Sequence, residues 1–298
     1  MTLSATFKQQ LLASQQRCEE ALTGALDHLS ISDPYLADAM AYSLFNGGKR
    51  VRPFLVQATA LAMGIDDSRV DIAMAAIEMV HSYSLVHDDL PAMDDDDLRR
   101  GQPTCHIKFN EATAILAGDA LLTGGFEILA DMPADFSDAQ RLKLIRLLSK
   151  GSGASGMVAG QAIDLASVGQ DVDIAHLERM HGYKTGALIR ISVLMGAHCG
   201  QPDAVTLEQL TVYANAIGLA FQVQDDILDI ESDTATLGKQ QGADVALNKP
   251  TYPALLGLAG AKEKAAQLHQ LALNALEKLP GDTSALAQLA DYIITRDH

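Results

Sequence analysis

The sequence is poor in aromatic residues and in positive charge. It has no tryptophan, and aromatic residues make up 5% of its 298 positions, which disfavours recognition of bases by stacking. Its 22 lysine and arginine residues stand against 38 aspartate and glutamate residues, a formal net charge of −16. A surface this acidic repels nucleic acids and anionic membranes. We therefore expect no nucleic-acid partner.

Cysteine and long apolar runs are also scarce. Cys18, Cys105 and Cys199 are widely spaced and form no C-x-x-C pair, which is typical of reduced thiols and not of a disulfide framework or a zinc site. Residues 1–10 have no long apolar core, so no signal peptide is expected. No run approaches 18 uninterrupted apolar residues. We expect a cytoplasmic protein without a membrane span.

Hydrophobic residues make up 48% of the chain, enough for a large core. Apolar residues recur with a period near 3.6, and strand-like alternation is rare. The expected helices cover residues 3–29, 34–45, 53–63, 67–86, 111–130, 139–159, 174–199, 207–230, 253–278 and 283–295, with a weak point at Thr185 and Gly186. Their short connections predict one all-α domain over residues 1–298.

Six carboxylates fall within the ten residues 88–97, directly before Arg99 and Arg100. An isolated acidic run is usually a solvated loop. This one, however, follows the mostly apolar stretch 72–86, and Pro91 breaks the helix within it. Such oxygen-rich clusters suit Mg²⁺ that is shared with substrate phosphates.

The acidic residues of this first motif fall into two groups. Asp88 and Asp89 are adjacent, and Asp94 lies six positions after Asp88. An undistorted helix would place Asp94 about 120° from the face of Asp88, but the break at Pro91 allows it to swing back. Residues 95–97 are expected to be solvated or paired with the two arginines.

A second acidic motif, residues 225–229, ends another apolar run. Asp225 and Asp229 are four residues apart and share one helix face, with Asp226 beside them. Phe221 and Gln222 lie one turn earlier. Two carboxylates on a mostly apolar helix need a counter-charge. A metal is favoured, and interhelical salt bridges remain the alternative.

Separated cations form the other chemical groups. In residues 47–53, Lys49 and Arg52 sit at a helix start beside backbone N–H groups, an arrangement that binds phosphate; ordinary surface cations are the alternative. Lys184 lies in an apolar helix, where it is costly unless it meets a charge or snorkels. Residues 160–164 are expected to be a polar exit from an apolar helix. Lys239 and Lys249 follow the second acidic motif.

These groups together indicate one substrate type. Two aspartate motifs for Mg²⁺, several cations for phosphates and an apolar helical interior fit an apolar chain that carries a diphosphate. His81 shares a helix with Asp88 two turns away and is interpreted as a substrate hydrogen-bonding residue.

On these motifs the chain resembles the short-chain trans-prenyl diphosphate synthases, in particular the bacterial enzymes that make farnesyl diphosphate. The resemblance rests on residues 47–53, 88–101, 160–164, 184–185 and 221–229, in this order. It implies a helical bundle of the isoprenoid synthase type around a deep central cavity, usually a homodimer. It also implies head-to-tail (1′–4) condensation of isopentenyl diphosphate with dimethylallyl and geranyl diphosphate.

The resemblance assigns roles to these residues. Three Mg²⁺ ions, with Mn²⁺ as an alternative, are expected on Asp88, Asp89, Asp94, Asp225, Asp226 and Asp229. The allylic diphosphate would be held by Arg99, Lys184, Lys239 and Lys249. Isopentenyl diphosphate would be held by Gly48, Lys49, Arg52, His81 and Arg100. Lys184, Thr185, Phe221, Gln222 and Asp225 would line the reacting centre, where Thr185, Gln222 and backbone carbonyls would stabilise an allylic cation.

The length of the product is expected to depend on Tyr83 and Ser84. If the substrate tail runs back along the helix from Asp88, Tyr83 lies five residues, or about 7.5 Å, below it. An isoprene unit is about one helical turn long, so a ten-carbon tail reaches roughly to the level of Tyr83. Ser84 is more nearly under Asp88 but is small, and an ordinary core tyrosine is the alternative.

Three other functions share part of this pattern. A geranylgeranyl diphosphate synthase shares the widened first motif. A class I terpene cyclase would need neither the cations of residues 47–53 nor a second motif of this form. A non-catalytic, acidic metal-binding partner subunit would be expected to have disrupted motifs.

Overall fold

The computed structural model describes residues 5–231 and 250–296. Lys239 and Lys249 lie outside the described residues. The elements are α1 (Ala5–Leu29), α2 (Pro34–Leu44), α3 (Val51–Ala62), the 3₁₀ turn η1 (Asp67–Arg69), α4 (Asp71–Asp88), β1 (Leu98–Arg99), β2 (Gln102–Pro103), α5 (Cys105–Lys108), α6 (Glu111–Ala130), α7 (Asp138–Ser152), α8 (Met157–Ser167), α9 (Ile174–Lys184), α10 (Gly186–His198), α11 (Ala204–Glu231), α14 (Tyr252–Leu276) and α15 (Ser284–Thr295). The expected all-α fold is confirmed.

Local capping explains where several helices begin. Asp33 accepts a hydrogen bond from the backbone N–H of Leu36 at 2.8 Å, directly before Pro34 at the first helical position. Ser137 and Gln140 form a capping box at the start of α7. These side chains satisfy N–H groups that have no partner within the helix.

The break between α9 and α10 falls at Thr185, as expected from its weak pattern. The single helix expected over residues 139–159 was wrong, because α7 ends at Ser152 and α8 begins at Met157. A Cβ at Gly156 would lie 2.1 Å from the carbonyl oxygen of Gly151, so the turn needs glycine there. Residues 160–164 consequently lie inside α8 and are not an exit from a helix. The short hairpin of β1 and β2 and the one-turn α5 were not expected.

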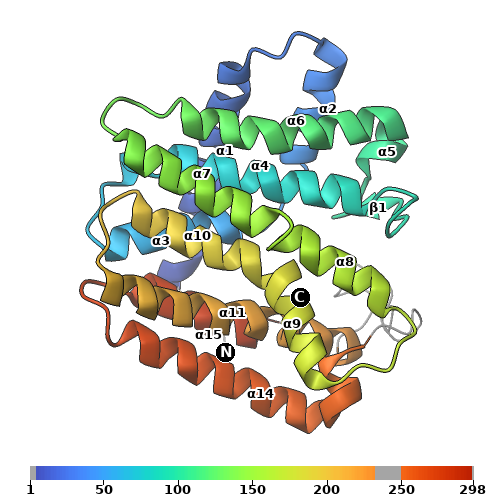
Figure 1. The fold of residues 1–298 in the computed structure, drawn as a ribbon, viewed down its shortest axis with the longest axis vertical. Coiled ribbons are helices and arrows are strands. Elements are labelled where there is room, and N and C mark those ends of the chain that lie inside the picture. Colours follow the sequence, from blue (N-terminus) through green and yellow to red (C-terminus); the bar gives the residue numbers. More distant parts are fainter. Residues whose placement is uncertain (1–4, 232–249, 297–298) are drawn as a thin grey trace.

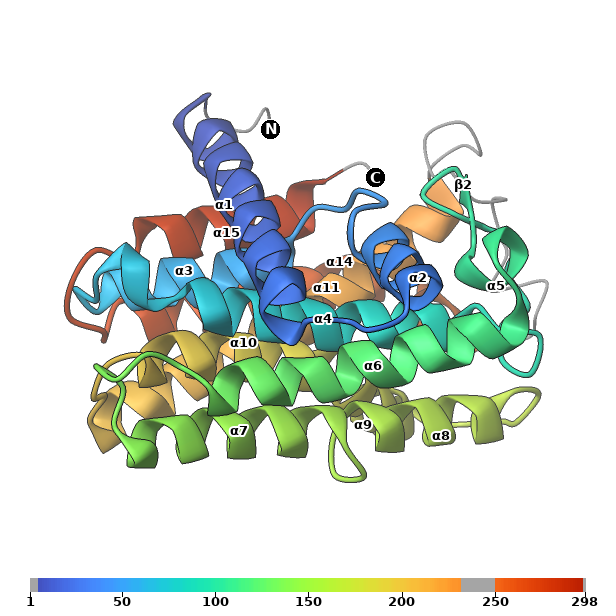
Figure 2. The ribbon, with the colours of Figure 1, turned by 90° about the horizontal axis from the view of Figure 1, so that it is seen from above.

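Helix α4 runs through the middle of the bundle, with α6 along one side and α3 and α10 on the other (Figure 1). Its residues 73–80 are all buried. In the view from above, α7 and α8 follow one another along one edge, and α1 rises from the opposite edge (Figure 2). Because α4 is enclosed, the side chains at its C-terminal end are presented to the interior of the bundle.

Helix α6 is the one described helix that is long and apolar enough, by length and composition, to cross a membrane. Of its most apolar window, 44% is buried inside the structure, and it packs against α4, α2 and α7. The core helix of a globular bundle has the same composition. The expectation that nothing spans a membrane therefore stays a prediction, as does the single-domain organisation.

One buried ion pair ties the start of α3 to α4. Arg50 has a left-handed backbone (φ 49°) and caps α3. Its Nη1 donates to Glu78 Oε1 at 2.6 Å, and the two side chains are 1% and 3% exposed. Arg50 also donates to the carbonyl of Leu44. The pair therefore fixes the loop that precedes α3 against the central helix.

Glu78→Gln should destabilise the protein, because it leaves the buried charge of Arg50 without its counter-charge. Breaking one side of such a pair costs roughly 3–5 kcal/mol. The matched control is Glu231→Gln, whose partner Lys262 is at the surface, where a pair contributes about 0–1 kcal/mol. Urea unfolding of both variants measures the difference. Equal losses would contradict the structural role given to Arg50 and Glu78.

Candidate active site

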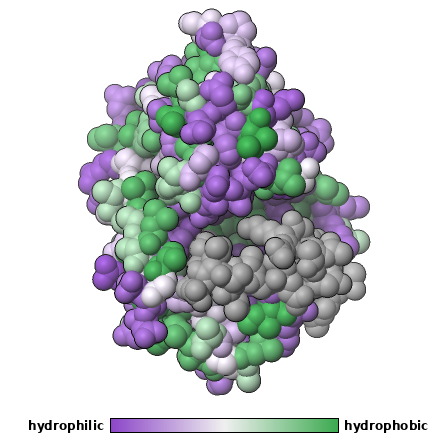
Figure 3. Space-filling view, turned by 90° about the vertical axis from the view of Figure 1, so that its right-hand side faces the viewer, coloured by the Kyte–Doolittle hydropathy of each residue, from purple (hydrophilic) through white to green (hydrophobic). Residues whose placement is uncertain are grey.

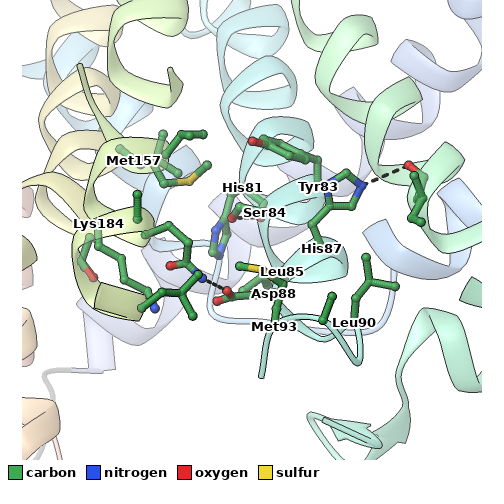
Figure 4. Close-up of a pocket in the computed structure, with 18 of the residues that line it drawn as sticks. His81, Tyr83, Ser84, Leu85, His87, Asp88, Leu90, Met93, Met157 and Lys184 are labelled. Carbon is green, nitrogen blue, oxygen red and sulfur yellow. Dashed lines mark hydrogen bonds between the residues drawn. The ribbon is translucent and has the colours of Figure 1, made fainter. Parts of the chain in front are cut away.

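A cavity of about 580 Å³ opens where α4 ends. Its walls are mostly apolar and include Tyr83, Ile115, Met157 and Leu188, while Asp88, Lys184 and Thr185 also line it. Figure 4 shows these walls around the last turns of α4. Figure 3 looks onto the side where α4 ends and shows a recess with hydrophobic residues inside it. We call this space the apolar cavity.

A second cavity of about 590 Å³ is lined by cations. Its lining includes Lys49, Arg50, Arg52, Arg100 and Arg296, and among the described residues Glu78 is the one acidic side chain there. We call it the cationic cavity. Arg52 and His81 line both cavities, so the two spaces meet at this pair.

The shared pair has a defined protonation. A guanidinium only donates, so Arg52 Nη1 donates to His81 Nε2 at 3.1 Å. Burial, reinforced by the charges of Arg52, Arg100 and other arginines, holds the pKa of His81 well below its usual value. Burial likewise lowers the pKa of Arg52 to about 10. At neutral pH the junction therefore consists of one charged arginine and one neutral imidazole.

The loop before α3 shapes the cationic cavity. Arg100 donates to the side chain of Asn46 and to the carbonyl of Gly47. A Cβ on Gly48 would lie 2.5 Å from the Arg100 guanidinium, and Gly48 has a φ of 126°. Glycine is therefore required at this position for the Arg100 side chain to lie against the loop. The expected grouping of Gly48, Lys49, Arg52, His81 and Arg100 is present.

The first acidic motif folds back at Pro91 as expected. The backbone N–H of Asp94 donates to the carbonyl of Asp88 at 2.9 Å, which returns Asp94 to the end of α4. The pKa of Asp88 is raised to about 6, mainly by burial; the charge of Lys184 opposes this rise and the charge of Asp94 contributes to it. Gln161 of α8 donates to Asp88. A cation at this point would relieve the repulsion between the two carboxylates.

Asp89 is placed differently from Asp88. It is 3% exposed and lies outside both cavities. Arg99 Nε donates to both of its carboxylate oxygens at 2.8 Å. Asp96 lies 3.8 Å from the same guanidinium, in line with the expectation that residues 95–97 are solvated or paired. Asp89 thus orients Arg99, and its role as a metal ligand stays a prediction.

The kink between α9 and α10 holds two pairs of polar side chains. Lys184 Nζ lies 2.5 Å from Asp164 Oδ2 of α8. Thr185 Oγ1 donates to Gln222 Oε1 at 3.1 Å. A Cβ on Gly160 would lie 2.1 Å from the backbone nitrogen of Lys184, so α8 and α9 touch there through their backbones. The costly lysine is therefore paired with Asp164 and does not snorkel.

The second acidic motif also divides. Asp226 is buried, and its Oδ2 accepts from the backbone N–H of Tyr252 at 2.9 Å while its Oδ1 accepts from Gln222. Asp226 therefore supports the start of α14. Asp225 and Asp229 are less buried on α11, which leaves Asp226 the least accessible of the three predicted ligands.

Arg296 was missed from the sequence. Its Nη2 donates to Asp225 Oδ1 at 2.5 Å and to the carbonyl of Phe221 at 2.9 Å. Its guanidinium carbon lies 3.9 Å from the centre of the Phe221 ring. Only one signal existed: a lone arginine directly after the last apolar helix. Gln161 and Asp164, which lay in a noted polar segment, likewise had no assigned partners.

The donor set fits Mg²⁺. Within residues 5–231 and 250–296, no three histidine, cysteine, aspartate or glutamate side chains converge as a ready-made metal site. Mg²⁺ is usually held by one or two carboxylates together with substrate phosphates. The half-buried Asp88 with Asp94, and Asp225 with Asp229, can supply such carboxylates.

Comparison with known proteins agrees with this geometry. Residues 33–291 match the polyprenyl synthetase family. The chain is 53% identical over 292 residues to the farnesyl diphosphate synthase of Haemophilus influenzae. The aligned residues cover 97% of this chain and 98% of that protein. The chain belongs to the polyprenyl synthetase family. All the motifs predicted from the sequence lie within residues 33–291, which match the family, whereas Arg296 lies after them.

Two further relatives bear on the site. The chloroplastic geranylgeranyl pyrophosphate synthase of Capsicum annuum is 44% identical over 278 residues, which cover 92% of this chain and 75% of that protein. A geranyltransferase from Helicobacter pylori, solved in complex with magnesium and isoprenyl diphosphate, is 34% identical. It superposes with a TM-score of 0.81 and covers 99% of this chain and 98% of its own.

Asp88→Asn and Asp225→Asn should weaken binding of Mg²⁺ with inorganic diphosphate, because each removes the negative charge of one predicted metal ligand. A lost charge-assisted contact costs roughly 1.5–3 kcal/mol, about ten- to a hundred-fold in affinity. Asp97→Asn, on the exposed part of the same motif, is the control. Titration calorimetry measures all three. A comparable loss for Asp97→Asn would refute the division into ligands and solvated acids.

Proposed function

We propose that the chain condenses isopentenyl diphosphate with dimethylallyl diphosphate and then with geranyl diphosphate, head to tail, to give farnesyl diphosphate. One observation carries this proposal: an apolar cavity with an acidic end meets a cationic cavity at Arg52 and His81. Two diphosphates can then be bound in different places with their hydrocarbon parts side by side.

The allylic substrate occupies the apolar cavity with its tail between α4, α8 and α10. Its diphosphate lies at Asp88 and Asp94 on one side and at Asp225 and Asp229 on the other. Lys184 and Arg99 add positive charge there. Isopentenyl diphosphate occupies the cationic cavity, where Lys49, Arg52 and Arg100 bind its phosphates and the neutral His81 donates through Nδ1, a buried atom with no protein partner.

Asp88, Asp94, Asp225 and Asp229 would hold Mg²⁺, which would supply Lewis-acid assistance to the departure of the allylic diphosphate. The hydroxyl of Thr185 and the amide oxygen of Gln222, held together at 3.1 Å, face positive charge that develops on the allylic carbon. The C–O bond of the allylic substrate breaks, and a bond forms between its C1 and C4 of isopentenyl diphosphate. The proton lost from C2 passes to the released diphosphate.

The relatives favour the fifteen-carbon product, because the farnesyl synthase is more similar than the geranylgeranyl synthase. The test is direct. The protein is incubated with the two five-carbon diphosphates and Mg²⁺, and the alcohols are identified after dephosphorylation. Farnesol supports the proposal, geranylgeraniol supports the alternative, and no product would favour the metal-binding partner subunit.

A homodimer is part of the same proposal. Helix α6 exposes Ile115 (43%) and Leu116 (57%), and α5, which packs against α6, exposes Ile107; a second copy would cover these apolar side chains. The three buried thiols support a reducing, cytoplasmic location. Sedimentation equilibrium measures the oligomeric state, and a monomer at micromolar concentration would overturn the dimer.

Lys49→Ala and Arg52→Ala should raise the KM for isopentenyl diphosphate more than the KM for the allylic substrate. Each substitution removes one charge-assisted contact, and this loss should weaken the affinity for isopentenyl diphosphate about ten- to a hundred-fold. Steady-state kinetics with each substrate varied in turn give both constants. Equal effects on the two would place the second diphosphate elsewhere.

Tyr83→Ala should lengthen the product from fifteen carbons towards twenty or more. Tyr83 is 8% exposed and lines the apolar cavity, whereas Ser84 lines it too but is small and donates to the carbonyl of His81. Met79 and Ala76 are fully buried below, so shortening Tyr83 opens space towards them. Chromatography of the dephosphorylated products is the measurement. If the active variant makes the unchanged product, Tyr83 does not form the floor of the cavity.

A further inference from the structure

The ring of His87 lies between Tyr83 and α6, where it also borders the apolar cavity (Figure 4). The two rings meet edge to face, with centroids 5.3 Å apart and an angle of 85°. On its other side, His87 Nε2 lies 3.0 Å from the carbonyl oxygen of Ile115. A carbonyl only accepts, so Nε2 carries a proton and donates. The imidazole is therefore attached to α6 and in contact with Tyr83.

Gly118 makes this position available. It follows Ile115 by three residues and lies on the same face of α6. A Cβ at Gly118 would lie 2.1 Å from His87 Nε2 and 2.4 Å from its Cδ2, closer than real Cβ contacts come. The ring of His87 occupies the space that any side chain at residue 118 would fill. The absence of a side chain there thus lets the imidazole lie directly on the helix backbone.

The direction of His87 separates it from the metal end of the site. Neighbouring residues of a helix point about 100° apart, and Figure 4 shows Asp88 on the cavity side while His87 reaches towards α6. Tyr83 and His87 are four residues apart and so share one face of α4. Tyr83 cannot move towards α6 without displacing the imidazole.

We propose that His87, held against Gly118, is a positioning residue that fixes Tyr83 and thereby sets the depth of the apolar cavity and the length of the product. This inference rests on the proposed function, in which Tyr83 forms the floor. Two changes should then act in opposite directions. Removing the imidazole lets Tyr83 retreat towards α6, and a methyl group at residue 118 pushes the imidazole and Tyr83 towards the cavity.

The experiment compares His87→Ala and Gly118→Ala with the unmodified protein, using dimethylallyl and isopentenyl diphosphate with Mg²⁺. For His87→Ala we expect a several-fold rise in the twenty-carbon fraction. For Gly118→Ala we expect a several-fold rise in the ten-carbon fraction. The controls are His28→Ala, an exposed histidine paired with Asp131, and Gly24→Ala, where a Cβ meets nothing within 4 Å. Both controls should keep the original product.

Thermal unfolding shows which variants fold. If Gly118→Ala does not fold, the result for His87→Ala decides alone. A folded His87→Ala enzyme with an unchanged product overturns the inference. So does an equal loss of rate with five-carbon and ten-carbon starters, which would place His87 at the reacting end. Tyr83→Ala is measured in parallel. If it keeps the fifteen-carbon product, the floor itself is misplaced; if it lengthens the product and His87→Ala does not, only the backing role fails.

Discussion

The repulsion between carboxylates at the end of α4 is the constraint on which the rest of the site depends. Like charges repel each other more strongly where burial excludes water. The chain nevertheless returns Asp94 to Asp88 through a backbone hydrogen bond. The raised pKa of Asp88 records the burial and the repulsion together. Lys184 of α9 and Gln161 of α8 stabilise the Asp88 carboxylate against both effects. Their convergence on Asp88 requires the close backbone approach of α8 and α9 at Gly160.

The two cavities differ in the charges that line them. Asp88 and Lys184 lie together in the wall of the apolar cavity, whereas lysine and arginine side chains predominate in the cationic cavity. A neutral His81 lies at the junction and accepts from Arg52. Because the imidazole has no charge, it adds nothing to the repulsion among the surrounding arginines. Arg296 connects the two regions from the end of the chain, since it lines the cationic cavity and pairs with Asp225.

Sequence periodicity predicted most helices, and residue chemistry predicted most of the site. The bounds of α6 matched the expected residues 111–130 because its apolar pattern is continuous. The break between α7 and α8 was missed because its cause is a backbone contact at Gly156, which no local pattern encodes. Aspartates that look equivalent in the sequence divide in the fold: Asp89 and Asp226 are buried beside Arg99 and Tyr252. Arg296 and its partner Asp225 are 71 residues apart, so only the tertiary structure brings them together.

The central helix separates the tasks of the site by angle. At about 100° per residue, positions seven apart nearly coincide and positions four apart differ by about 40°. His81, Ser84 and Asp88 therefore share the face that meets the substrates, and all three line the apolar cavity. Tyr83 and His87 share a neighbouring face of α4, which also borders the apolar cavity, and from it His87 reaches α6. In the proposed function, one enclosed helix therefore binds the allylic diphosphate with one face and limits the length of the product with the next. On that proposal, product length can change through Tyr83 and His87 while the residues that bind the diphosphates keep their positions.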